Sequence, residues 1–174
     1  NSIKRAITEA AEGDVHIVEI GGTVGDYEGL SFVEAIREYA HEVGRDNCLF
    51  VHVVYVPFLE ASREYKTKPA QNALADLRGF GIMPDVVGVR TEGHNRPPKS
   101  IGDKIAVSSG VRSEGIIMMP NVDSVYEVPL TVSRDLGALL SSFTGNRTEP
   151  DLKRWKRLAE RDTTEYKKEV TIGL

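Results

Sequence analysis

The stretch Leu49–Val56 constrains the fold of this chain most, because it is apolar almost throughout rather than at every second position. A strand with one solvated face alternates between apolar and polar residues, whereas a strand covered on both faces reads as a continuous apolar run. Shorter strand-like runs occur at Val15–Ile20, Asp85–Arg90 and Gly115–Met119, with helix-like segments between them. This alternation predicts an α/β domain whose parallel sheet carries helices on both faces.

The helix-like segments are marked by residues typical of helix ends. Pro69 stands in the first turn of one helix and Gly81 follows its end, the usual asymmetry between proline and glycine. Ser31 and Glu34 have the spacing of a capping box, and Gly44 is placed to act as a left-handed cap. The predicted helices are Ser2–Ala11, Ser31 to His41 or Val43, Pro69–Phe80, Ser100–Ser108, Val132–Phe143 and Asp151–Lys168.

Composition narrows the class of protein further. With 174 residues, 40% of them hydrophobic and 28% charged, the chain matches one globular domain with a real core. It holds no apolar run of about 18 residues, and its net charge of -4 gives no general attraction to nucleic acid. Cys48 is the single cysteine, which excludes an internal disulfide framework and leads us to expect a reducing, cytoplasmic location. The sequence begins at Asn1 and ends in a strand-like run, so we expect a fragment.

Acidic residues gather where the first predicted strand ends. Ligands of such sheets bind beyond the carboxyl ends of the strands. Glu19 closes the first run, as a magnesium-binding carboxylate would, although a solvated strand end is the alternative. The glycine-rich loop Gly21–Glu28 carries Asp26 and Glu28, acceptors that suit sugar hydroxyls, a base amine or metal-bound water. The alternative for this loop is a polar surface turn.

Basic residues precede the helix that begins near Pro69. Lys66 and Lys68 flank Thr67, and a helix N-terminus favours anions, so this segment predicts a triphosphate clamp. An exposed basic turn remains the alternative, and Lys104 is uninformative on its own. The four histidines show no spacing typical of zinc. The chain also contains no lysine-bearing phosphate loop.

Four segments together resemble a known family. The four segments are Glu19–Glu28, Pro57–Gln71, Gly81–Asp85 and Val122–Leu130. Their order along the chain is the one found in CTP synthases. The chain resembles the amidoligase (synthetase) domain of that family over nearly its whole length. The resemblance implies a P-loop NTPase fold similar to dethiobiotin synthetase, lacking the N-terminal portion that carries the phosphate loop and a second magnesium-binding aspartate.

The resemblance also implies roles for individual residues. Glu19 corresponds to a magnesium ligand. Residues corresponding to the site for UTP and inhibitory CTP are Asp26, Tyr27, Glu28, Lys66, Thr67, Lys68, Pro69, Ala70, Gln71 and Lys104, and those corresponding to the ATP adenine site are Pro120, Asn121 and Val122. Ala70 replaces a usual threonine, Tyr27 a smaller aliphatic residue, and Pro120-Asn121 a common Lys-Asp pair. The segment Thr91–Lys99 carries a short insertion.

The family's activity is the ATP-dependent amination of UTP to CTP through 4-phosphoryl-UTP. Ammonia comes from glutamine, in a glutaminase domain further along the chain, and the enzyme assembles as a tetramer. We therefore expect residues 1–168 to be the C-terminal part of the synthetase domain and residues 169–174 to begin the connection to the glutaminase domain. The fragment alone is expected to be inactive. Two alternatives are another ATP-dependent ligase of dethiobiotin-synthetase-like fold and a non-catalytic nucleotide-binding or assembly fragment.

Overall fold

The computed structural model describes residues 2–93, 97–164 and 171. Its helices are α1 (Ser2–Ala10), α2 (Leu30–Val43), α3 (Lys68–Gly79), α4 (Lys99–Ser109), α5 (Val128–Thr144) and α6 (Lys153–Asp162). Its strands are β1 (Val51–Val56), β2 (Phe58–Leu59), β3 (Glu64–Tyr65), β4 (Val86–Thr91) and β5 (Ile116–Pro120), and short 3-10 turns are η1 (Arg45–Asn47), η2 (Ser113–Gly115) and η3 (Val125–Glu127). No helix within the described residues combines the length and apolar character needed to cross a bilayer.

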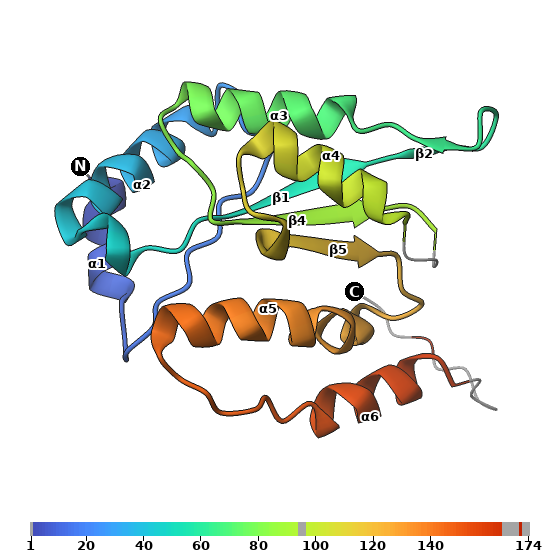
Figure 1. Cartoon of the computed structure of the whole chain (residues 1–174). Helices are drawn as coiled ribbons and strands as arrows, with labels where there is room; N and C mark the ends of the chain where they lie inside the picture. The colour runs from blue at the N-terminus through green and yellow to red at the C-terminus, as the bar shows by residue number, and fades with distance from the viewer. Residues whose placement is uncertain (1, 94–96, 165–170, 172–174) are drawn as a thin grey trace.

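A parallel sheet of order β1-β4-β5 forms the centre of the molecule. In its register Val54 lies opposite Val89, and Val89 lies opposite Met118. Helices α3 and α4 lie on one face of this sheet, and α5 lies on the other with α6 beyond it (Figure 1). The predicted α/β fold, a parallel sheet with helices on both faces, is confirmed.

The main core lies between the sheet and the pair α3 and α4. Its buried members are Val54, Val56, Ala70, Leu74, Val87, Val89, Ile101 and Ile105. A second cluster on the opposite face joins Val86 and Ile117 of the sheet to Val132 of α5. Branched residues dominate both clusters because they pack well against the pleated surface of a sheet.

The second face of the sheet is covered only in part. Helix α5 packs against β5, while the side chains of Val51, Val53 and Tyr55 on β1 are 50%, 54% and 46% exposed. The continuous apolar sequence of β1 had predicted cover on both faces. One face of β1 is instead open. Several apolar side chains of this strand are therefore not covered by the described residues.

Three local predictions were wrong. Val15–Ile20 is not a strand: the segment belongs to no sheet among the described residues, and Ile17 is 86% exposed. An apolar run becomes a strand only when a neighbouring strand pairs with it. The Ser31–Glu34 capping box is also absent, because α2 begins one residue earlier after Gly29, without a side-chain cap. Gly44 does follow the end of α2, but its φ of 90° and ψ of 129° are not those of a left-handed cap.

The remaining predicted elements are present with shifted ends. Helix α5 begins at Val128, before the predicted start, and the charged helix α6 covers Lys153–Asp162. Residues 165–168 of the predicted last helix lie outside the described residues, as does most of the strand-like C-terminal run. The β2-β3 hairpin was not predicted. Its strands are short, and the rings of Phe58 and Tyr65 pack against each other with centroids 4.9 Å apart.

Candidate functional site

The predicted basic clamp lies where the hairpin leads into α3. Thr67 precedes the helix, Lys68 is its first residue and Pro69 stands in its first turn, as the sequence predicted. The backbone N–H of Lys66 donates to the carbonyl of Pro57 at 2.9 Å, which ties the clamp to the end of β1. Gln71 donates from its side-chain Nε2 to Thr67 Oγ1 at 3.2 Å. The N-terminus of α3 is therefore flanked by two lysines in the sequence, Lys66 before it and Lys68 as its first residue.

Ala70 differs from its neighbours in the clamp. Its side chain is only 1% exposed and belongs to the main core, together with Leu74. The small side chain lets the first turn of α3 approach the sheet closely. Any contact from this position to a ligand would therefore run through the backbone rather than through the side chain.

Lys104 reaches the same region from α4. It lines a cavity of about 370 Å³ together with Gln71, Asp103, Val107 and Ser108. Two predicted site residues that are far apart in the sequence, Gln71 and Lys104, thus face one hollow between α3 and α4. The structure brings them together because both helices pack side by side on the same face of the sheet.

Glu64 links the cationic groups of this region. Lys66 Nζ donates a hydrogen bond to Glu64 Oε1. This hydrogen bond, a second one from Ser62 and the nearby charges of Lys66 and Lys104 hold the pKa of the Glu64 carboxyl below its usual range. The Glu64 carboxylate therefore interacts with Lys66, which lies between β3 and α3, and with the charge of Lys104 on α4.

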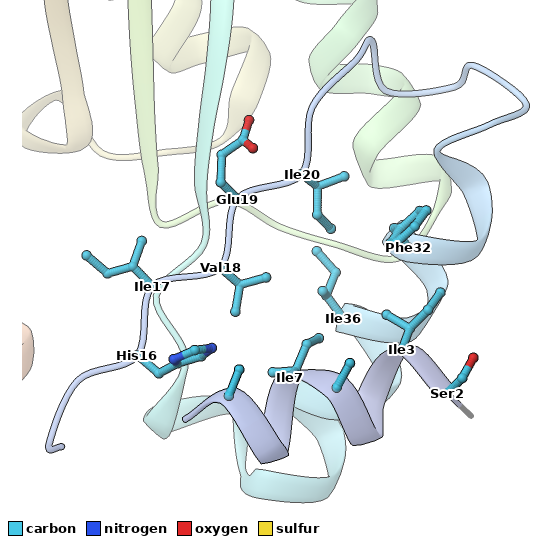
Figure 2. A pocket seen from close by; sticks show the side chains of 12 residues that line it. Ser2, Ile3, Ile7, His16, Ile17, Val18, Glu19, Ile20, Phe32 and Ile36 are labelled. Atoms are coloured by element: carbon cyan, nitrogen blue, oxygen red, sulfur yellow. The ribbon is translucent and has the colours of Figure 1, made fainter. Parts of the chain in front are cut away.

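The structure places Glu19 in an exposed position. Glu19 lines, together with its neighbours Val18 and Ile20, a mostly apolar groove of about 550 Å³ that runs between residues 16–20 and helices α1 and α2. In Figure 2 the carboxylate of Glu19 points away from α1, whereas Val18 points toward it. Glu19 is accordingly available to solvent and ligands, and it is not packed in hydrocarbon.

At this position a magnesium ion could be bound by one protein carboxylate, that of Glu19. Among the described residues, no group of three or more histidine, cysteine, aspartate or glutamate side chains is arranged to hold a metal ion. Mg²⁺ is often bound by one or two carboxylates while water and substrate phosphates complete its shell. An exposed Glu19 fits that mode of binding, and it does not fit a dedicated cage built by this chain alone.

The acidic loop forms a pair of tight turns on the surface. Asp26 N–H donates to Thr23 O at 3.1 Å, and Gly29 N–H donates to Asp26 O at 3.0 Å. Tyr27 is 90% exposed, and Glu28 is exposed as well. Within residues 2–93 and 97–164, no hydrogen bond or ion pair joins this loop to the clamp lysines or Lys104. The fold thus brings part of the predicted pyrimidine site together and leaves this loop apart.

The predicted adenine segment follows the last strand. Pro120 ends β5, and the backbone N–H of Asn121 donates to Gly93 O at 3.1 Å, just beyond the end of β4. Val122 is half-buried. Ser124 then donates to Asp162 Oδ2 at 2.6 Å, which connects the segment to α6. These bonds fix the segment at the carboxyl edge of the sheet, where ligands of such folds bind.

Sequence reasoning missed Glu92, which organises the same edge. Its carboxylate accepts a hydrogen bond from the hydroxyl of Tyr55 and another from the backbone N–H of Phe58 at 3.1 Å. The carboxylate thereby ties the end of β4 to the start of the hairpin that leads to the clamp. An acid directly after an apolar strand was the available signal, the same one that identified Glu19. Sequence reasoning also missed Glu64, whose signal was its position two residues before Lys66.

Comparisons with known proteins agree on one family. The family model described as CTP synthase N-terminus matches residues 1–142. The chain is 45% identical over 178 residues to the CTP synthase of Acidobacterium capsulatum, 44% over 177 residues to that of Koribacter versatilis, and 41% over 179 residues to that of Methanocaldococcus jannaschii. Each match covers 100% of this chain, which spans about a third of each relative: 32%, 31% and 32%. On this evidence, the chain belongs to the CTP synthase family.

Proposed function

We propose that this chain provides part of the nucleotide site of an ATP-dependent ligase that aminates UTP to CTP with ammonia derived from glutamine. Membership of the family supports the reaction class. The observation that carries the proposal is that Gln71 of α3 and Lys104 of α4 line one cavity, while Lys68 begins α3 and Lys66 lies two residues before it. Cations beside a helix N-terminus suit the triphosphate of a pyrimidine nucleotide.

The residues of this chain bind and orient the nucleotide in the proposed reaction. Phosphoryl transfer to O4 of uracil would create a leaving group, and ammonia would then displace it at C4. Such transfer depends on positioning and on neutralising charge more than on covalent help from the protein. Lys66, Lys68 and Lys104 would hold the phosphates of UTP or of inhibitory CTP. Thr67 and Gln71 would contribute hydrogen bonds.

Glu19 would hold Mg²⁺ together with phosphate oxygens and water. When bound, the ion would neutralise charge on the triphosphates. The segment Pro120–Val122 would contact the adenine of ATP, mainly through its backbone. Asp26 and Glu28 would accept hydrogen bonds from ribose or base groups, and Tyr27 would contribute through its backbone.

The complete site would require further protein. The acidic loop lies apart from the clamp, which fits a nucleotide bound across the interface of a homotetramer. The open apolar face of β1 fits cover by other parts of a longer enzyme. The glutaminase domain would follow residues 169–174, and the enzyme would work in the cytoplasm. We accordingly expect this chain alone to bind pyrimidine nucleotide weakly and not to synthesise CTP.

Substitutions in the longer enzyme test the proposed roles. Lys104→Ala removes a charge-assisted contact, so the KM for UTP is expected to rise by about tenfold or more. Lys99→Ala is the matched control, since Lys99 begins α4 but does not line the cavity. Glu19→Ala is expected to abolish magnesium-supported turnover, and near-normal activity of this variant would contradict the role of Glu19.

Ligand choice separates the competing functions. If the longer enzyme accepts UTP and rejects other acceptors, it is a CTP synthase. If it rejects UTP and accepts another acceptor, it is another ligase of dethiobiotin-synthetase-like fold. Calorimetry of this chain with UTP or CTP and Mg²⁺ addresses the third possibility. Complete absence of binding would favour a non-catalytic assembly fragment.

A further inference from the structure

The clamp has an acidic residue of its own. Glu64 is the first residue of β3 and lies two residues before Lys66, and its carboxylate accepts a hydrogen bond from the Lys66 ammonium group. Both side chains are about half-exposed, at 50% for Glu64 and 44% for Lys66. The ion pair is therefore open to solvent, and a dissolved anion can compete for the lysine.

The position of Glu64 matters because its carboxylate is bonded to one clamp lysine, Lys66. The charge of Lys104 on α4, together with the bonds from Lys66 and Ser62, favours the ionised carboxylate. Lys68, by contrast, has no acidic partner within the part of the chain that the structure describes. The Glu64 carboxylate thus pairs with one of the two clamp lysines, Lys66, and leaves the other, Lys68, without an acidic partner among the described residues.

We propose that Glu64 is an internal counter-ion of the clamp, and that the phosphates of a pyrimidine nucleoside triphosphate must displace it from Lys66 in order to bind. The inference rests on the proposed nucleotide site and adds a residue that sets its affinity. Glu64 and a phosphate carry charge of the same sign and bind the same ammonium group, so the two exclude each other. Glu64 thereby weakens binding of the anionic part of the ligand and leaves recognition of the base unchanged.

The expected size of this effect follows from the exposure of the pair. Exposed ion pairs are weak, and the strength of a typical pair corresponds to about a 1.4- to fivefold change in an equilibrium constant. Removing the competing carboxylate should therefore tighten nucleotide binding within that range. The gain should shrink at high ionic strength, because salt screens exposed charges.

Calorimetry on this chain tests the proposal with two ligands, CTP and inorganic tripolyphosphate. Glu64→Gln keeps the size of the side chain and removes its charge. Glu60→Gln is the matched control, because Glu60 is an exposed acid on the same hairpin and the substitution changes net charge equally. We expect Glu64→Gln to bind both ligands about 1.4- to fivefold more tightly than the control at low ionic strength. Glu64→Asp, which keeps the charge, should stay closer to the wild-type protein.

The other possible results of the calorimetry also separate the counter-ion role from the nucleotide site. Equal affinities of Glu64→Gln and Glu60→Gln, or weaker binding by Glu64→Gln, would overturn the counter-ion role while leaving the nucleotide site in place. Binding by Glu64→Gln where the wild-type chain shows none would support the role in its strongest form. Failure of every variant to bind either ligand would contradict both the counter-ion and the proposed site in this chain.

Discussion

Gly115, at the junction between η2 and β5, is a position where one added methyl group should disturb the fold. A Cβ atom there would lie 2.6 Å from Val111 Cγ1 and 2.7 Å from the backbone oxygen of Asp85. Both distances are shorter than real Cβ contacts, so atoms must shift. The Val111 side chain can rotate. The carbonyl of Asp85 can move only together with the backbone that leads into β4.

Asp85 is held from several sides and has little freedom to yield. Its backbone N–H donates to Phe50 O at 2.8 Å, and its carboxylate accepts from Phe50 N–H at 2.7 Å. Arg45 Nη2 donates to both oxygens of the same carboxylate at 2.8 Å. Overpacking at such a site costs about 1–3 kcal/mol, so we expect Gly115→Ala to lower the free energy of unfolding by that amount.

Urea unfolding followed by Trp155 fluorescence measures the effect, and Gly137→Ala provides a control with the opposite sign. Gly137 lies inside α5, and a Cβ built there meets no heavy atom within 4 Å. Alanine at that position should raise the free energy of unfolding by about 0.5–1 kcal/mol, because glycine loses more backbone entropy in a helix. If Gly115→Ala were neutral, or if both substitutions shifted the midpoint in the same direction, the packing argument would be refuted.

Two further predictions concern the core beneath the site. Leu74→Ala, at a fully buried position of α3, should lower the free energy of unfolding by about 2–5 kcal/mol in the same urea assay, and a loss below 1 kcal/mol would show that the core collapses into the space. Burial lowers the pKa of His52 below its ordinary value of 6.5, so its contribution to stability is complete above that pH and is lost as the pH falls through the folded-state pKa. Wild-type protein should therefore lose more stability than His52→Leu between neutral and mildly acidic pH, and equal losses would exclude this histidine as the cause.

The sequence determined the main architecture because apolar runs and helix-end residues alternate clearly along the chain. Apolar runs separated by helix signals predicted the parallel sheet, and Pro69 predicted the start of α3 nearly to the residue. The order of four motifs predicted the family, which the family model and the relatives confirm. These features are local or ordered along the chain, so they can be read without coordinates.

Pairing between distant segments was decided only by the tertiary structure. Val15–Ile20 has the composition of a strand, yet it belongs to no sheet in the described chain, since composition cannot supply a hydrogen-bonding neighbour. Lys104 carried no signal of its own and acquired one when α4 packed beside α3, next to Gln71. Glu92 likewise gained its role only in the folded chain, where its carboxylate accepts hydrogen bonds from the Tyr55 hydroxyl and the Phe58 N–H. The local sequence pattern indicates which segments are apolar enough to be buried. Only the folded chain shows which segments pack against them.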